Sequence, residues 1–226
     1  MPRDLTPEII TSIRQLVAVQ LWQLGAVKVN LETPFRLVSG NYSPIYINCR
    51  QLISAPAFAD LFGAASRILC EAHDIRFDVV AGGETAGIPF AAILARTFAK
   101  PMAYVRKATK EHGLGSLVEG VFSQDARVLL VEDLITDAGS KLHFIEGIKR
   151  AGGTVPGVLV IFDRQQGGYE LLASMNIRLL SITDMETALN VAQAVGLLGV
   201  SELASVNKYL QSPGDWHTER NLDYIK

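Results

Sequence analysis

Short apolar runs alternate with longer amphipathic stretches through most of the chain. The continuous apolar run at residues 128–131 predicts a strand buried on both faces of a sheet, and short, largely apolar segments predict further strands at residues 77–81, 102–105, 155–162 and 177–181. Apolar residues at helical spacing predict helices at residues 9–24, 57–72, 88–98, 141–150, 183–194 and 202–210. The alternation of strand and helix from residue 77 to residue 181 predicts an α/β fold with a central, mostly parallel sheet flanked by helices.

Residues 26–47 show a different pattern, with repeated turns. Turn residues stand at Pro34, at Ser39-Gly40 and at Ser43-Pro44, which together predict an antiparallel hairpin. We therefore predict one domain over residues 1–226. Its core covers about residues 57–182, and a small hood is formed by about residues 1–50 together with the C-terminal segment.

The tail and two histidines carry no visible chemistry. The chain after Ser212 includes Trp216 but no recognisable motif. His73 and His217 have no identifiable partner in the sequence, so we expect both at the surface.

The most informative stretch runs from Arg127 to Ser140 and reads RVLLVEDLITDAGS. A buried strand leads into two acids, Glu132 and Asp133, and then into a small polar loop that opens a helix. Loop amides and a helix N-terminus can hold a phosphate, whereas vicinal hydroxyls can donate hydrogen bonds to the carboxylates. A phosphate beside a diol describes a ribose 5-phosphate.

Two further segments add basic groups to this picture. Arg106, Lys107, Lys110 and His112 crowd into seven residues with neighbouring glycines, which predicts a mobile basic loop able to close over a pyrophosphate leaving group. Arg164, in DRQQGG, follows the strand predicted at 155–162. Ligands of open α/β sheets bind beyond the carboxyl ends of the strands, so Arg164 is expected to face the same crevice and to suit a carboxylate.

Composition narrows the class of protein. Of 226 residues, 49% are hydrophobic and 19% charged, which is typical of a globular enzyme. A formal net charge of −2 gives no reason to expect nucleic-acid binding. Two cysteines are too few for a disulfide framework and favour a reducing compartment, so we expect a cytoplasmic protein without membrane attachment.

These motifs carry a resemblance to a known family. The stretch from Glu132 to Ser140 resembles the phosphoribosyl-pyrophosphate (PRPP) loop of type I phosphoribosyltransferases. FRLVSGNYSPIYINCR, the RK-x-x-K-x-H-G loop and DRQQGG resemble segments of orotate phosphoribosyltransferases. The resemblance implies the type I phosphoribosyltransferase fold and a pentosyltransferase that converts orotate and PRPP, with Mg²⁺, to orotidine 5′-phosphate and pyrophosphate in pyrimidine (UMP) biosynthesis. It also implies a homodimer in which each basic loop covers the neighbouring active site.

The resemblance assigns roles residue by residue. It implies PRPP contacts for Arg106, Lys107, Lys110, His112, Glu132, Asp133, Leu134, Ile135, Thr136, Asp137, Ala138, Gly139 and Ser140. Catalytic roles fall to Lys107, Lys110, His112 and Asp133, and orotate contacts to Thr136 and Arg164. Tyr46 either forms a wall of the base pocket or packs in an apolar layer. No residue is assigned as a general base or as a direct metal ligand, because Mg²⁺ is expected to be held mainly through PRPP.

This chain departs from the family pattern at three places. Val38 replaces a lysine found in many bacterial members, and Thr85-Ala86 replaces the bulky Tyr-Lys of other branches. Asp137-Ala138 stands where many relatives have Thr-Gly. We expect the Asp137 side chain to point away from the phosphate, and the loop to differ locally because alanine tolerates positive φ less well than glycine.

Two alternatives stay open at this point. A phosphoribosyltransferase for uracil or a purine would keep the PRPP loop without needing Arg164. A PRPP-sensing regulator would need a DNA-binding module, for which the roughly 30 residues before the FRLVSGNYSPIYINCR segment are too few.

Overall fold

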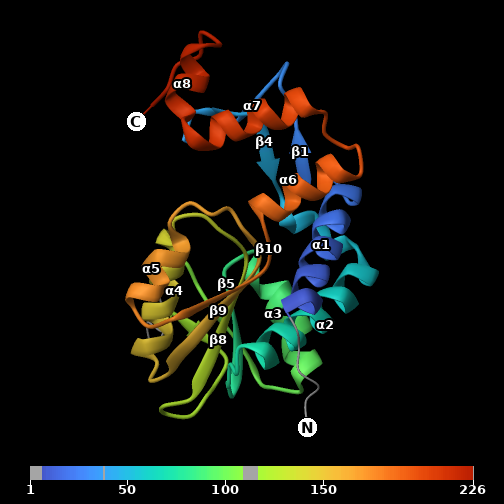
Figure 1. The fold of residues 1–226 in the computed structure, drawn as a ribbon. Helices are drawn as coiled ribbons and strands as arrows, with labels where there is room; N and C mark the ends of the chain where they lie inside the picture. Colours follow the sequence, from blue (N-terminus) through green and yellow to red (C-terminus); the bar gives the residue numbers. More distant parts are fainter. Residues whose placement is uncertain (1–6, 38, 109–116, 226) are drawn as a thin grey trace.

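A computed structural model describes residues 7–37, 39–108 and 117–225. Its centre is a six-stranded sheet in the order β10-β9-β8-β5-β6-β7 (Figure 1). All neighbours in it are parallel except β6 and β7. The strands are β5 (Val79–Gly83), β6 (Met102–Val105), β7 (Val118–Glu119), β8 (Arg127–Ile135), β9 (Thr154–Asp163) and β10 (Arg178–Asp184). The predicted α/β class is confirmed.

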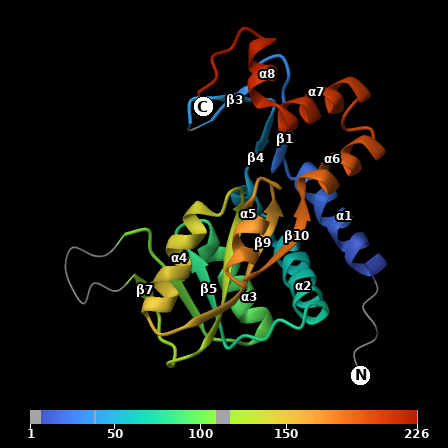
Figure 2. The same ribbon diagram turned by 60° about the vertical axis from the view of Figure 1, so that its left-hand side comes forward.

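Helices cover both faces of this sheet, and the strand sequences show why. Successive side chains of a strand point to opposite faces. Along β8, Leu129 and Val131 join the core under α2 (Pro56–Ala72) and α3 (Gly87–Phe98). Val128 and Leu130 join the core on the side of α4 and α5 (Figure 2). These two helices span Gly139–Arg150 and Gly168–Ser174. The continuous apolar runs of the sequence are therefore strands with two buried faces.

The hood is built from both ends of the chain (Figure 1). The single hairpin predicted at residues 26–47 is two short antiparallel pairs, β1 with β4 and β2 with β3. Tyr46 is 40% exposed, with its ring 5.4 Å from that of Phe35, so it does not pack in an apolar layer. The hood elements are α1 (Pro7–Gln23), β1 (Val27–Val29), β2 (Phe35–Arg36), β3 (Tyr42–Ser43), β4 (Ile45–Ile47), the 3-10 helix η1 (Cys49–Ser54), α6 (Met185–Ala194), α7 (Val200–Gln211) and α8 (Pro213–Thr218).

The prediction that His217 lies at the surface is wrong. Its side chain is fully buried: Nε2 accepts a hydrogen bond from the Tyr42 amide at 3.0 Å, and Nδ1 donates to the Pro213 carbonyl at 2.6 Å. Trp216 beside it is also fully buried. The tail folds back onto the β2–β3 pair, and this long-range contact leaves no local pattern in the sequence. His73 is partly exposed at the end of α2.

Both cysteines are buried free thiols. Within the described part of the chain, no helix is long and apolar enough to cross a membrane.

Candidate functional site

The acidic pair, predicted to follow directly after the strand, lies within β8. β8 continues through Glu132 and Asp133 to Ile135. Because consecutive strand residues face opposite sides, the two carboxylates do not lie side by side. Asp133 faces the hood, where the Arg50 guanidinium Nε is 4.0 Å from Oδ2, whereas Glu132 enters the layer of α4. The prediction that both hold ribose hydroxyls stays a prediction, but their surroundings differ sharply.

Glu132 is one half of a buried ion pair. Its Oε2 lies 3.3 Å from Nζ of Lys141, and each side chain is less than a tenth exposed. Its other oxygen, Oε1, is buried without a hydrogen-bond partner among the described residues. Burial raises the pKa of Glu132 to about 7; Lys141 acts in the opposite direction, and Asp133 adds to the rise.

The glycines of the turn after β5 make room for this carboxylate. A Cβ on Gly83 would lie 2.3 Å from Glu132 Oε1, and one on Gly87 would lie 2.5 Å from the same atom. Glycines after a strand let the backbone approach a ligand closely or make a tight turn into the following helix. The structure adds that the turn wraps around Glu132. Thr85 of the same turn is exposed, and Ala86 is buried.

The start of the basic loop is tied to that turn. The Lys107 amide donates to Oε2 of Glu84 at 2.7 Å, and the Glu84 amide donates to the Val105 carbonyl at 2.8 Å. Arg106 points toward Glu119, with Nη1 and Oε1 3.9 Å apart. The Lys107 side chain is exposed. Lys110 and His112 lie outside the described residues, as does Val38 in the hood.

The loop from Thr136 to Ser140 has the expected strand-loop-helix form. Ala138 adopts φ +65° and ψ 6°, so alanine takes the left-handed conformation usual for glycine. The expectation that Asp137 points away is wrong, because its Oδ1 accepts a hydrogen bond from the Gly139 amide at 3.0 Å. This carboxylate therefore occupies one amide of the predicted phosphate loop. Gly139 and Ser140 are exposed at the start of α4.

Backbone bonds join the phosphate loop to the segment that carries Arg164. The Arg164 amide donates to the Ile135 carbonyl at 3.0 Å, and the Gly168 amide donates to the Thr136 carbonyl at the same distance. The Ile135 side chain is fully buried and the Leu134 side chain is partly buried. A PRPP contact from either residue would therefore use mainly its backbone.

Arg164 has an incompletely partnered guanidinium. Its Nε is buried without a hydrogen-bond partner in the part of the chain that the structure describes. Burial lowers the pKa of Arg164, whereas the hydroxyl-bearing Tyr209 of α7 acts in the opposite direction. A buried cation without an anion is costly, so this position is suited to a ligand carboxylate.

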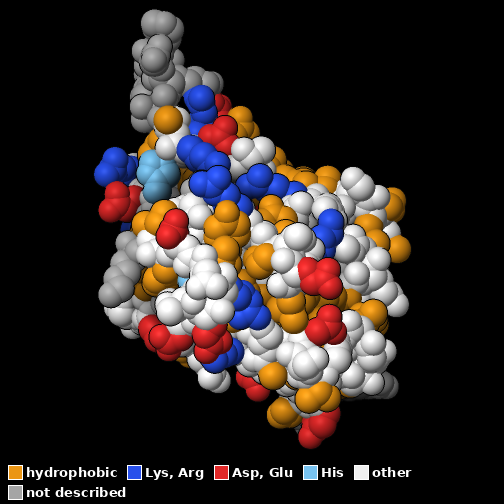
Figure 3. All heavy atoms as spheres, turned by 90° about the horizontal axis from the view of Figure 1, so that it is seen from above, with side chains coloured by type: hydrophobic (Ala, Val, Ile, Leu, Met, Phe, Trp, Pro, Cys, Tyr) orange, Lys and Arg blue, Asp and Glu red, His pale blue; other side chains and the backbone are white. Residues whose placement is uncertain are grey.

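Sequence reasoning missed three residues at this edge of the sheet: Arg50, Lys141 and Tyr209. Lys141 directly follows the recognised loop and could have been noticed as a cation opening α4. The contacts of Arg50 and Tyr209 come from the hood, and no local signal indicated them. Viewed from the hood side, Lys and Arg side chains gather in a band across the surface, which suits a polyanionic ligand (Figure 3).

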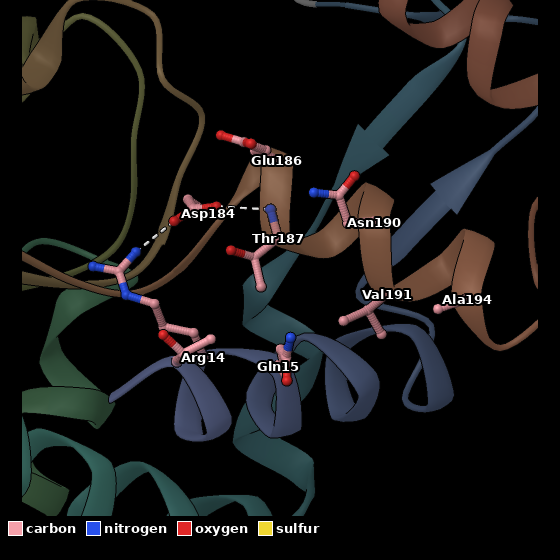
Figure 4. Close-up of a pocket in the computed structure, with 9 residues that line it drawn as sticks. Arg14, Gln15, Asp184, Glu186, Thr187, Asn190, Val191 and Ala194 are labelled. Carbon is pink, nitrogen blue, oxygen red and sulfur yellow. Dashed lines mark hydrogen bonds and ion pairs between the residues drawn. The ribbon is translucent and has the colours of Figure 1, made fainter. Parts of the chain in front are cut away.

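A separate hollow of about 480 Å³ lies between α1 and α6 (Figure 4). The Arg14 guanidinium and Asp184 Oδ2 form an ion pair of 2.5 Å in it, and Asp184 Oδ1 also accepts from the Thr187 amide. None of the predicted site residues lines it. Its central charges are already paired, so it joins α1 to the sheet and is not the reaction site.

The raised pKa of Glu132 predicts a pH dependence of stability. Its ordinary value is 4.5 and its folded value is about 7, so the folded protein binds this proton more tightly than the unfolded chain. This contribution to the free energy of unfolding therefore falls as pH rises through that window. Relative to Glu132→Gln, the wild type should lose about 2–3 kcal/mol between about pH 5 and about pH 8. Urea unfolding of both proteins at several pH values checks this, and a pH-independent difference would contradict it.

Comparisons with known proteins agree with this geometry. Residues 49–191 match the phosphoribosyl transferase domain family. The chain is 44% identical over 209 residues to an orotate phosphoribosyltransferase of Rhizobium meliloti, covering 89% of both chains. It is 42% identical over 213 residues to one of Agrobacterium fabrum, covering 91% of this chain and 90% of the relative. The solved orotate phosphoribosyltransferase of Aeropyrum pernix is 36% identical, with a TM-score of 0.66, and the match covers 81% of this chain and 99% of that one.

Proposed function

The chain belongs to the orotate phosphoribosyltransferases, and we propose that it performs their reaction at the sheet edge around Asp133 and Arg164. It transfers the 5-phosphoribosyl group of PRPP to orotate, giving orotidine 5′-phosphate and pyrophosphate in pyrimidine nucleotide synthesis. The observation that carries the site assignment is the half-buried Arg164, whose guanidinium Nε is buried without a hydrogen-bond partner among the described residues. It is linked by backbone bonds to the same loop that would hold the ribose phosphate.

The charges that develop in the reaction suggest the role of each group. As pyrophosphate leaves ribose C1, positive charge grows on the sugar and negative charge grows on the leaving oxygens. Asp133, whose Oδ2 lies 4.0 Å from Nε of Arg50, would hold a ribose hydroxyl and favour the sugar cation. The amides and hydroxyls of Thr136 to Ser140 hold the 5′-phosphate. Binding there requires the Asp137 carboxylate to leave the Gly139 amide, or the phosphate to use the other donors.

Arg164 would orient the second substrate. A bidentate pair with the orotate carboxylate fixes the plane and direction of the ring, so that N1 faces ribose C1. The Thr136 carbonyl is already engaged by Gly168, which leaves its side chain for contact with the base. Uracil and the purines lack the carboxylate, so the buried Nε of this guanidinium would gain no carboxylate partner from them.

We expect Mg²⁺ to be held mainly by PRPP. Among the described residues there is no group of three or more His, Cys, Asp or Glu side chains that could hold a metal. Oxygen-rich PRPP supplies the ligands that Mg²⁺ prefers, and the bound ion would neutralise the leaving pyrophosphate.

The lid, the homodimer and the cytoplasmic location stay predictions from the family. The basic groups in question are Arg106, Lys107, Lys110 and His112. They would stabilise the departing pyrophosphate by closing over it from the neighbouring subunit. The tie between the Lys107 amide and Glu84 supports this, since it anchors the start of the loop beside the glycine turn.

Lys110→Ala tests the assignment of the loop. We expect kcat for orotate consumption to fall at least tenfold, because one cation that stabilises the leaving group is lost. Lys100→Ala is a matched control, since Lys100 is an exposed lysine at the end of α3, and it should keep wild-type kcat. Each protein is assayed by orotate absorbance with PRPP, with Mg²⁺ or with chelator. Equal rates for the two variants would remove Lys110 from the mechanism.

A further inference from the structure

A buried lysine that the reaction scheme does not use lies between the two halves of the PRPP site. Lys141 Nζ is 3.3 Å from Glu132 Oε2 and donates to Ser140 Oγ at 3.2 Å. The residue is only 6% exposed. One ammonium group therefore contacts both the acid of the ribose end and the hydroxyl of the phosphate end.

This arrangement is costly unless it serves the site. Removing two charges from water carries a penalty that a single ion pair often fails to offset, and apolar residues would fill such a space at least as stably. The pair is also incomplete, because Glu132 Oε1 has no partner among the described residues. Gly83 and Gly87 leave just the space that this oxygen occupies, so the glycine turn, the acid and α4 share one buried contact.

We propose that Lys141 is a positioning residue for PRPP, which fixes the Glu132 carboxylate and the Ser140 hydroxyl relative to each other. The inference rests on the proposed function and deepens it. The lysine does not contact the reacting atoms. It sets the spacing between the ribose-binding and phosphate-binding groups, and its charge lies next to the loop that receives a phosphate.

The position of Lys141 explains why a lysine suits this place. It is the first buried residue of α4, and its stem packs inside while the ammonium reaches back toward the start of the helix. Charges facing Glu132 come from three elements: Lys141 on α4, Asp133 on β8 and Lys107 at the start of the basic loop. Of these, only Lys141 makes a direct contact with the carboxylate.

Lys141→Met tests the proposal by separating binding of PRPP from folding. We expect KM for PRPP to rise at least tenfold while KM for orotate stays within about twofold. Lys149→Met on the same helix is the matched control, since Lys149 is exposed, and it should change neither constant. Ile148→Ala, a buried truncation on α4, controls for destabilisation alone and should lower the unfolding midpoint without selectively raising KM for PRPP.

A double-mutant cycle separates positioning from a purely structural ion pair. If Lys141 acts through Ser140, the double variant should lose less PRPP affinity than the product of the fold-losses measured for Ser140→Ala and Lys141→Met alone. Strictly multiplicative losses, or an unchanged KM for PRPP in Lys141→Met, would overturn the proposal. If Lys141→Met fails to fold, Lys141→Gln is the second variant, because it keeps a hydrogen-bond donor and removes the charge. It should raise KM for PRPP three- to tenfold. A wild-type KM for PRPP in Lys141→Gln would also overturn the proposal. Wild-type orotate consumption tests the proposed function independently of every variant.

Discussion

Replacing Arg164 by leucine is expected to lower kcat/KM for orotate by about a thousandfold. A buried charge pair that loses one partner typically costs 2–5 kcal/mol, which corresponds to about 30- to several-thousandfold. The burial of Arg164 Nε and its lack of a protein partner place this residue toward the upper part of that range. KM for PRPP should change less than threefold, because the phosphate loop is held to this segment by backbone bonds that the substitution leaves in place.

Two variants make the Arg164 result interpretable. Arg164→Lys keeps the charge but not the planar fork, so kcat/KM should recover only in part. Arg178→Leu removes an exposed arginine at the start of β10 and should behave as wild type. Steady-state assays with orotate varied at saturating PRPP give the comparison. If Arg164→Leu kept kcat/KM within threefold of wild type, orotate would not be recognised through this guanidinium.

Gly87→Ala should strongly destabilise the fold. Its added Cβ would lie 2.3 Å from the Val131 carbonyl oxygen and 2.5 Å from Glu132 Oε1, so β8 and α3 would have to separate. Overpacking of a close-packed core costs about 1–3 kcal/mol and occasionally more. With backbone as the obstacle we expect about 3 kcal/mol or more of lost unfolding free energy, together with weakened PRPP binding.

Gly199→Ala is the matched control for this substitution. Gly199 has an ordinary φ of −72°, and an added Cβ would meet only Glu202 Oε2 at 3.4 Å. Its unfolding free energy should stay within about 0.5 kcal/mol of wild type. Urea unfolding of both variants decides the matter. Near-equal midpoints for Gly87→Ala and wild type would mean that the turn can move away from Glu132.

The core of the fold and the order of the site loops were predictable because their causes are local. Buried apolar runs such as residues 128–131 indicated strands with two covered faces, and this is confirmed. The acidic pair and the small loop that follows were expected between strand and helix. The prediction ended the strand at Val131, before Glu132 and Asp133, but β8 extends through both. Polar residues in a strand are not visible as strand from hydrophobicity alone, and this error hid the opposite orientation of the two carboxylates.

What the sequence did not indicate depends on contacts between distant segments. His217 is buried because α8 packs on β3, and Tyr209 of α7 acts on Arg164 across a long stretch of sequence. The Asp137 side chain turned back to the Gly139 amide, since an acid at a helix start finds a free donor there. In the sequence, Lys141 is indistinguishable from the other polar residues of an amphipathic helix. Its role is indicated only by its distance to Glu132.

The most direct test of the account offers the wild-type protein PRPP and Mg²⁺ with equal amounts of orotate, uracil, adenine and hypoxanthine. Chromatography with mass detection then identifies each nucleotide that forms. We expect orotidine 5′-phosphate alone, formed in a one-to-one ratio with pyrophosphate, because only orotate carries a carboxylate to pair with Arg164. Comparable formation of a uracil or purine nucleotide, or no loss of orotate while PRPP still binds, would contradict the central claim.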